Sequence, residues 1–75
     1  MTREEAIRLV NKEYFNAIEK YGDFTSKREG LTNIWEEFEE LKEAIFKHDK
    51  HNTLEEAIHL SAVVLKLITL FDYFD

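Results

Sequence analysis

Five carboxylates stand within eight residues near the middle of the chain, and they are the first candidates for chemistry. They are Glu36, Glu37, Glu39, Glu40 and Glu43. Most such runs are solvated helix faces. On a helix, however, Glu37 and Glu40 fall beside an apolar stripe, whereas the other three point away from it. Two carboxylates at this spacing repel each other unless a cation lies between them, so this pair is a candidate ligand set.

A second group of polar residues follows in the carboxy-terminal third of the chain. Glu56 lies in line with Leu60 and Val63 on a stripe suited to burial, and His59 follows three residues later. A buried carboxylate without a partner is costly. Without any metal, Glu56 is explained as a capping residue for a helix that begins after Thr53, and His59 as a histidine at the edge of the core. Lys66, two turns beyond His59, is by itself most typical of a solvated position.

Antiparallel packing of the two segments would bring Glu37, Glu40, Glu56 and His59 to one place. Carboxylate oxygens favour magnesium or manganese, which keep several waters and accept phosphate oxygens as further ligands. A site of this composition therefore suits phosphate chemistry.

The elements that position these residues are predicted to be helices. The chain has no proline and only two glycines, a composition typical of helices. Thr2 with Glu5 and Ser26 with Glu29 form capping-box patterns, and Gly22 is a typical helix stop. We therefore expect helices over residues 3–21 and 27–48, with Phe24 folded back onto the core.

The third helix is predicted over residues 53–74, capped by Asn52 or Thr53. It carries two apolar stripes and leaves only a narrow solvent-facing wedge. The wedge contains Glu55, Lys66, Thr69 and Tyr73. Two partner helices cannot easily cover both stripes, so a second chain is expected on one of them. The alternative is that one stripe is simply exposed.

The length of the chain and the absence of cysteine also favour association with a second chain. A chain of 75 residues without cysteine has neither disulfides nor thiolate zinc sites to support a small core. The sequence predicts an all-α protein, an antiparallel bundle of three helices per chain that is completed by homo-oligomerisation.

The charge pattern argues against several classes of function. The formal net charge is -6 and the basic residues are scattered, whereas duplex nucleic-acid binding usually needs a concentrated cationic patch. His59, Lys66 and Asp72 interrupt the apolar run over residues 57–74, so no membrane span is expected. No export signal is seen, and the cytoplasm is the expected location.

The stretch from Lys20 to Leu70 resembles the MazG-like, all-α nucleoside triphosphate pyrophosphohydrolases. That family has an ExxE pair on one helix and an ExxD pair on the next. Glu37 and Glu40 occupy the positions of the first motif, and Glu56 begins the second, with His59 where the family usually has aspartate.

The resemblance implies a magnesium-dependent enzyme that converts a nucleoside triphosphate to the monophosphate and pyrophosphate, commonly as a dimer or tetramer. It implies that Glu37, Glu40 and Glu56 hold the metal, together with His59 if that residue serves as a ligand. One of the glutamates, or Glu36 if it turns inward, would orient the attacking water.

The substrate-binding residues are implied less directly. Lys66 would contact a phosphate, and Trp35, Phe24 or a partner chain would stack on the base. Histidine is a poorer ligand for magnesium than aspartate. His59 therefore weakens the implied metal site, and the implied enzyme is either intact or degenerate. The alternative function is a non-catalytic helical oligomerisation or regulatory protein-interaction module.

Overall fold

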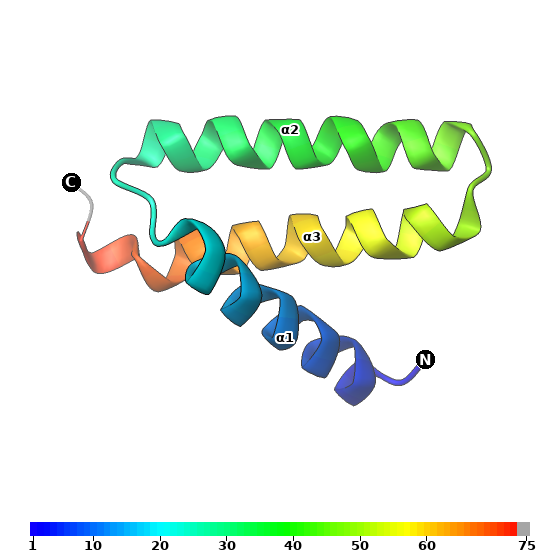
Figure 1. Cartoon of the computed structure of the whole chain (residues 1–75), viewed down its shortest axis with the longest axis horizontal. Helices are drawn as coiled ribbons and strands as arrows, with labels where there is room; N and C mark the ends of the chain where they lie inside the picture. Colours follow the sequence, from blue (N-terminus) through cyan, green and yellow to red (C-terminus); the bar gives the residue numbers. More distant parts are fainter. Residues whose placement is uncertain (74–75) are drawn as a thin grey trace.

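The structure is a computed structural model that describes residues 1–73 and contains only helices within that range (Figure 1). The helices are α1 (Arg3–Tyr21), α2 (Lys27–Phe46), α3 (Lys50–Thr69) and a short 3-10 helix, η1 (Phe71–Tyr73). The prediction of an all-α chain with three helices is therefore confirmed.

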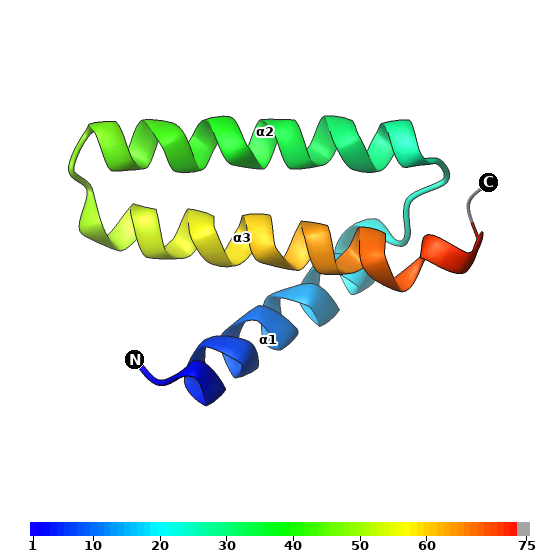
Figure 2. The same cartoon turned by 180° about the vertical axis from the view of Figure 1, so that it is seen from behind.

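Helix α3 lies between the other two helices. α2 and α3 form an antiparallel pair, and α1 crosses α3 obliquely on its other side, near the carboxy-terminal half of α3 (Figures 1 and 2). α1 and α2 each pack against α3 and not against each other. This arrangement leaves room between α1 and α2, with α3 as the floor.

The first helix and the start of the second have the predicted ends. The Thr2 hydroxyl accepts a hydrogen bond from the Glu5 backbone N–H at 3.1 Å, and the Ser26 hydroxyl accepts one from the Glu29 N–H at the same distance. Gly22 has a φ of 74°, which glycine adopts without a steric penalty, and its N–H donates to the Ile18 carbonyl.

The connection between α2 and α3 differs from the prediction. α2 ends at Phe46 rather than residue 48, because His48 adopts a left-handed φ of 57° that a helix cannot continue. α3 begins at Lys50 rather than residue 53. Its cap is Asp49, whose carboxylate accepts from the Asn52 backbone N–H at 3.0 Å and from the Asn52 side chain at 2.7 Å.

The earlier start of α3 changes the interpretation of Glu56. A capping glutamate must lie in the first turn of a helix, and Glu56 lies in the second turn of a helix that begins at Lys50. The explanation of Glu56 as a capping residue for Thr53 is therefore wrong, and its position needs another reason.

The carboxy-terminal end of α3 is also shorter than predicted. α3 ends at Thr69, whose hydroxyl donates to the Lys66 carbonyl at 2.9 Å, and η1 follows. The predicted end at residue 74 lies outside the described residues.

The core is small and draws on the loop between α1 and α2, on the end of α2 and on α3. Its buried apolar side chains are Phe24, Ala44, Ala62 and Val63. Phe24 folds inward as predicted and packs on Gly30, where an added Cβ would lie 3.2 Å from the Phe24 ring and 3.0 Å from Leu67. Glycine at this position therefore permits the close approach of the loop and α3 to α2.

Much apolar surface remains outside this core. A compact monomer of 9.0 kDa is expected to expose about 4,900 Å², whereas this chain exposes 5886 Å². The exposed large side chains include Leu31, Trp35, Phe38 and Ile45, which recur on one side of α2 and are called here the apolar face of α2.

Within residues 1–73, no helix has the length and apolar character required to cross a bilayer.

Candidate metal centre

Glu37 of α2 meets Glu56 and His59 of α3 where the two helices run antiparallel. The Nδ1 atom of His59 lies 3.5 Å from Oε2 of Glu56 and 3.9 Å from Oε2 of Glu37. One candidate ligand atom from each residue lies within 4.8 Å of the other two. The three side chains are between 19% and 31% exposed. We call this group the Glu37–Glu56–His59 cluster.

The two carboxylates in the cluster are not satisfied by the surrounding protein. Oε2 of Glu37 and Oε2 of Glu56 are buried and have no hydrogen-bond partner among residues 1–73. Burial, followed by the charge of Glu40, raises the pKa of Glu37 from 4.5 to about 7. Burial and the proximity of Glu40 also raise the pKa of Glu56, and His59 offsets part of both shifts. Unpartnered buried oxygens of this kind are uncommon and call for a cation or a proton.

The donor set fits a divalent cation with a modest inward movement. Magnesium binds oxygen at about 2.1 Å, so two of its ligand atoms lie at most about 4.2 Å apart. The cluster atoms span up to 4.8 Å, so side-chain rotations that shorten the distances by less than about 1 Å would be enough. Two carboxylates and an imidazole suit manganese as well as magnesium. A protonated His59 would supply the alternative positive charge.

Glu40 lies beside the cluster and is exposed to solvent. It lines a small cleft together with Glu56, Asp49 and Asn52. Its charge contributes to the raised pKa of both Glu37 and Glu56. The sequence predicted Glu40 as a fourth ligand, but Glu40 is not among the residues whose ligand atoms converge, which are Glu37, Glu56 and His59.

The remaining glutamates of α2 separate into two kinds. Glu39 pairs with Lys42 at 3.0 Å and Glu43 pairs with Lys47 at 2.6 Å, both at exposed positions. Such pairs contribute little to stability and are typical of a solvated face. Glu36 was expected to point away from the site, but it lines the groove that adjoins the cluster. That expectation is wrong, because Glu36 already lines the groove and does not have to turn inward to reach it.

A groove of about 960 Å³ runs between α1 and α2 with α3 as its floor. Glu37 and His59 line the end of the groove that adjoins the cluster. The loop end is lined by Lys20, Tyr21, Phe24 and Lys66. The groove is large enough for a small organic ligand, since such sites typically measure about 300–1,000 Å³.

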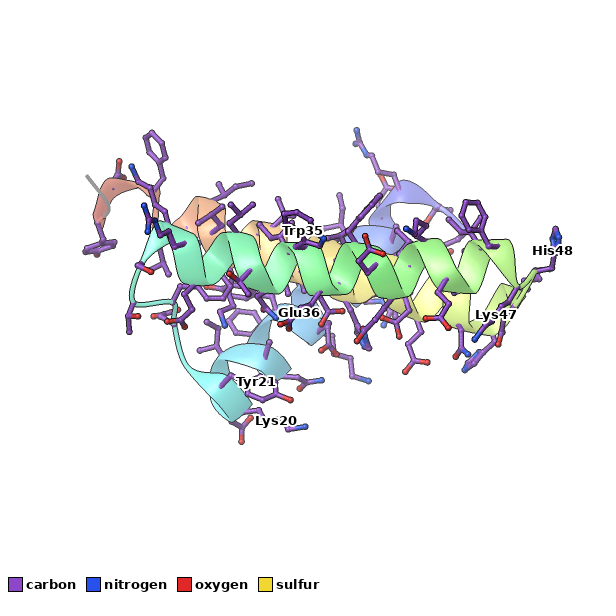
Figure 3. All side chains as sticks on the ribbon, turned by 90° about the horizontal axis from the view of Figure 1, so that it is seen from above. Lys20, Tyr21, Trp35, Glu36, Lys47 and His48 are labelled. Atoms are coloured by element: carbon purple, nitrogen blue, oxygen red, sulfur yellow. The ribbon has the colours of Figure 1, made fainter. Side chains whose placement is uncertain are left out.

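Two predicted substrate-binding residues take unexpected positions. Lys66 was expected in the solvent-facing wedge of its helix but is only 3% exposed, so that expectation is wrong. It nevertheless lines the groove. Trp35 is 65% exposed and is not among the groove residues. Figure 3 shows it on the opposite side of α2 from Lys20 and Tyr21, whereas Glu36 points toward them.

The aromatic wall of the groove comes from Phe24, which the sequence suggested both for packing and for stacking on a base, and from Tyr21, which it did not single out. Phe24 is 8% exposed, and Tyr21 lies exposed at the groove edge. Tyr21 comes directly before Gly22 and Phe24 follows two residues after it. An aromatic residue on either side of a helix stop is therefore the sequence signal for this wall.

Comparisons with models of known protein families, with curated proteins and with solved structures found no match for this chain.

Proposed function

We propose that the chain is a magnesium-dependent nucleoside triphosphate pyrophosphohydrolase of the MazG-like kind, intact or degenerate. Its products would be a nucleoside monophosphate and pyrophosphate. The observation that supports this proposal most directly is the meeting of Glu37 and Glu56, one from each acidic motif, with unpartnered buried oxygens beside a groove. The nearness of Glu40 to both adds a third carboxylate.

In the proposed mechanism, Glu37, Glu40 and Glu56 would hold the cation, with His59 as a further ligand or as a positive charge beside them. A bound magnesium or manganese ion would neutralise charge on the phosphates as the reaction proceeds. Glu36 lies in the groove next to Glu37 and would orient a water and accept its proton. The water oxygen would bond to the α-phosphorus while the bond from that phosphorus to the bridging oxygen breaks, and pyrophosphate would leave with the bridging oxygen.

Release of pyrophosphate is the direct test of this function. Wild-type protein is expected to release it from at least one canonical or modified nucleoside or deoxynucleoside triphosphate with magnesium or manganese. Glu37→Gln should abolish release, because it removes one negative ligand. Glu39→Gln is the matched control, since Glu39 pairs with Lys42 at the surface. If no nucleotide in a broad screen yields product with either ion, the enzymatic proposal is wrong.

Self-association forms a second part of the proposal. The surface of the chain exceeds that of a compact monomer by about 1,000 Å², close to the roughly 800 Å² that each partner buries in a standard interface. Leu31, Trp35 and Phe38 are 49% to 65% exposed on the apolar face of α2. A second copy covering this face would form a dimer or a tetramer and leave the groove open, since Trp35 and the groove lie on opposite sides of α2 (Figure 3).

The same observation favours a second candidate function, a non-catalytic helical assembly module. In that case sedimentation velocity would give one oligomer with or without a chelator, and no nucleotide would be hydrolysed. The glutamate substitutions would be neutral or stabilising under all conditions, because they relieve repulsion between like charges. A metal-dependent activity that Glu37→Gln abolishes would favour the enzyme over the assembly module.

A further inference from the structure

Lys66 is the only charged residue among residues 1–73 that is buried, with 3% of its surface exposed. No carboxylate of the described residues lies within 4.0 Å of its ammonium group. Its Nζ atom stands 4.2 Å from the centre of the Phe24 ring. The side chain also lines the groove at its loop end.

The near-complete enclosure of the Lys66 side chain is costly to the fold, because it gains no anionic partner among residues 1–73. Enclosing a cation without an anionic partner is costly, and a cation–π contact offsets only part of that cost. A buried charge that costs stability is typical of a binding position rather than of packing.

The position of Lys66 relative to the metal centre suggests what it binds. Lys66 and His59 are seven residues apart on α3 and line the same groove, which corresponds to about 10 Å along the helix axis. A lysine side chain extends toward its neighbours by several ångströms, so the separation matches the length of a short polyphosphate. Lys20, at the same end of the groove, adds a second, exposed cation.

The acidic residues of the groove limit the form in which such an anion enters. Glu13, Glu29, Glu36 and Glu37 line the groove together with the two lysines. One of them, Glu29, is engaged by the backbone N–H and hydroxyl of Thr25. A bare polyphosphate would be repelled by the others, whereas its magnesium complex carries less negative charge and brings the cation that the Glu37–Glu56–His59 cluster requires.

We propose that Lys66 binds the distal phosphate of a magnesium polyphosphate whose other end is held at the Glu37–Glu56–His59 cluster. The inference rests on the proposed function only in placing the magnesium end of the ligand at the Glu37–Glu56–His59 cluster. It makes Lys66 the residue that distinguishes a triphosphate from a monophosphate. Phe24 positions the ammonium group and keeps water from one side of it.

Calorimetry with magnesium tripolyphosphate and magnesium phosphate as probes tests this inference. Wild-type protein should bind the tripolyphosphate more tightly, and Lys66→Met should weaken that binding by about tenfold or more through the loss of a charge-assisted contact. Binding of phosphate should change little. Lys20→Met is the matched control, because Lys20 lines the same end of the groove but is exposed, and it should cause a smaller loss.

The melting temperature provides a second measurement on the same variant. If Lys66 is a binding residue, Lys66→Met should melt at or above the wild-type temperature, since it replaces a buried charge with an apolar chain. A lower melting temperature with unchanged tripolyphosphate binding would overturn the inference and assign Lys66 to packing. Equal losses for both probes would also overturn it. Lys66-dependent binding without pyrophosphate release would contradict only the proposed enzyme.

Discussion

Glu37→Gln is expected to make the metal-free protein more stable at pH 8, although the same substitution should abolish its activity. Glu37 is charged at this pH, and its side chain is only 20% exposed. Its pKa is raised to about 7 by burial and by Glu40. Glutamine keeps the shape and removes the charge. The gain should be on the order of 2–3 kcal/mol, since one pKa unit corresponds to about 1.4 kcal/mol.

The pH dependence of the wild-type protein provides the sign of this effect. The folded-state pKa of Glu37 lies above the unfolded value of about 4.5, so the folded state keeps the proton to higher pH. The free energy of unfolding should therefore fall as pH rises from about 4.5 to 7, and the cost is fully present above that range. Glu56, whose pKa is raised in the same direction, adds to the slope.

Thermal or urea unfolding in a chelator at several pH values measures both effects. Glu37→Gln should flatten the decline between pH 5 and 7 by a substantial fraction. At pH 8 it should melt roughly 10 °C above wild type, because about 1 kcal/mol shifts the midpoint of a small domain by 4–8 °C. Glu39→Gln should behave as wild type. A variant that is less stable than wild type at pH 8 would mean that Glu37 has an unrecognised partner.

His59→Asp is expected to have effects of opposite sign with and without magnesium. Without an ion, a third carboxylate would join Glu37 and Glu56, and His59 now offsets part of the pKa shift of both. Stability should fall in chelator. With magnesium, the added oxygen ligand suits the ion better than imidazole does, and binding to the folded state alone at 100 times the dissociation constant contributes about 2.7 kcal/mol.

The measurement is the melting temperature of His59→Asp with chelator and with saturating magnesium. The rise on adding magnesium should be about 10 °C or more and larger than that of wild type. His51→Asp is the matched control, because the His51 side chain lies on the same helix and is 87% exposed. If His59→Asp responds to magnesium no more than His51→Asp does, the cluster does not hold the ion.

The helices that carry the site were largely predictable from the sequence, because local side-chain chemistry determines most of their ends. Thr2, Gly22 and Ser26 each act within a few residues of the chain, and the structure has them in the expected roles. The start of α3 was harder to predict, since Asp49, Asn52 and Thr53 are all suitable caps. The structure uses the first of them, and this removes the capping explanation for Glu56.

The convergence of Glu37, Glu56 and His59 also followed from helix periodicity and antiparallel packing. Lys66 did not, because its burial depends on Phe24 and on where α1 crosses α3, and neither is encoded in the local pattern of α3. Trp35 and Glu36 are adjacent in the sequence but face opposite sides of α2 (Figure 3). Which of the two sides faces the groove is determined by the packing of α1.

Titration of the wild-type protein with magnesium, followed by NMR, tests most directly whether Glu37 and Glu56 tolerate their burial by sharing a cation. Saturable shifts should concentrate on Glu37, Glu40, Glu56 and His59, and Glu37→Gln should abolish them. Weak, unsaturable shifts spread evenly over the exposed acids of α1 and α2 would contradict a specific centre and leave protonation as the means by which these carboxylates are buried.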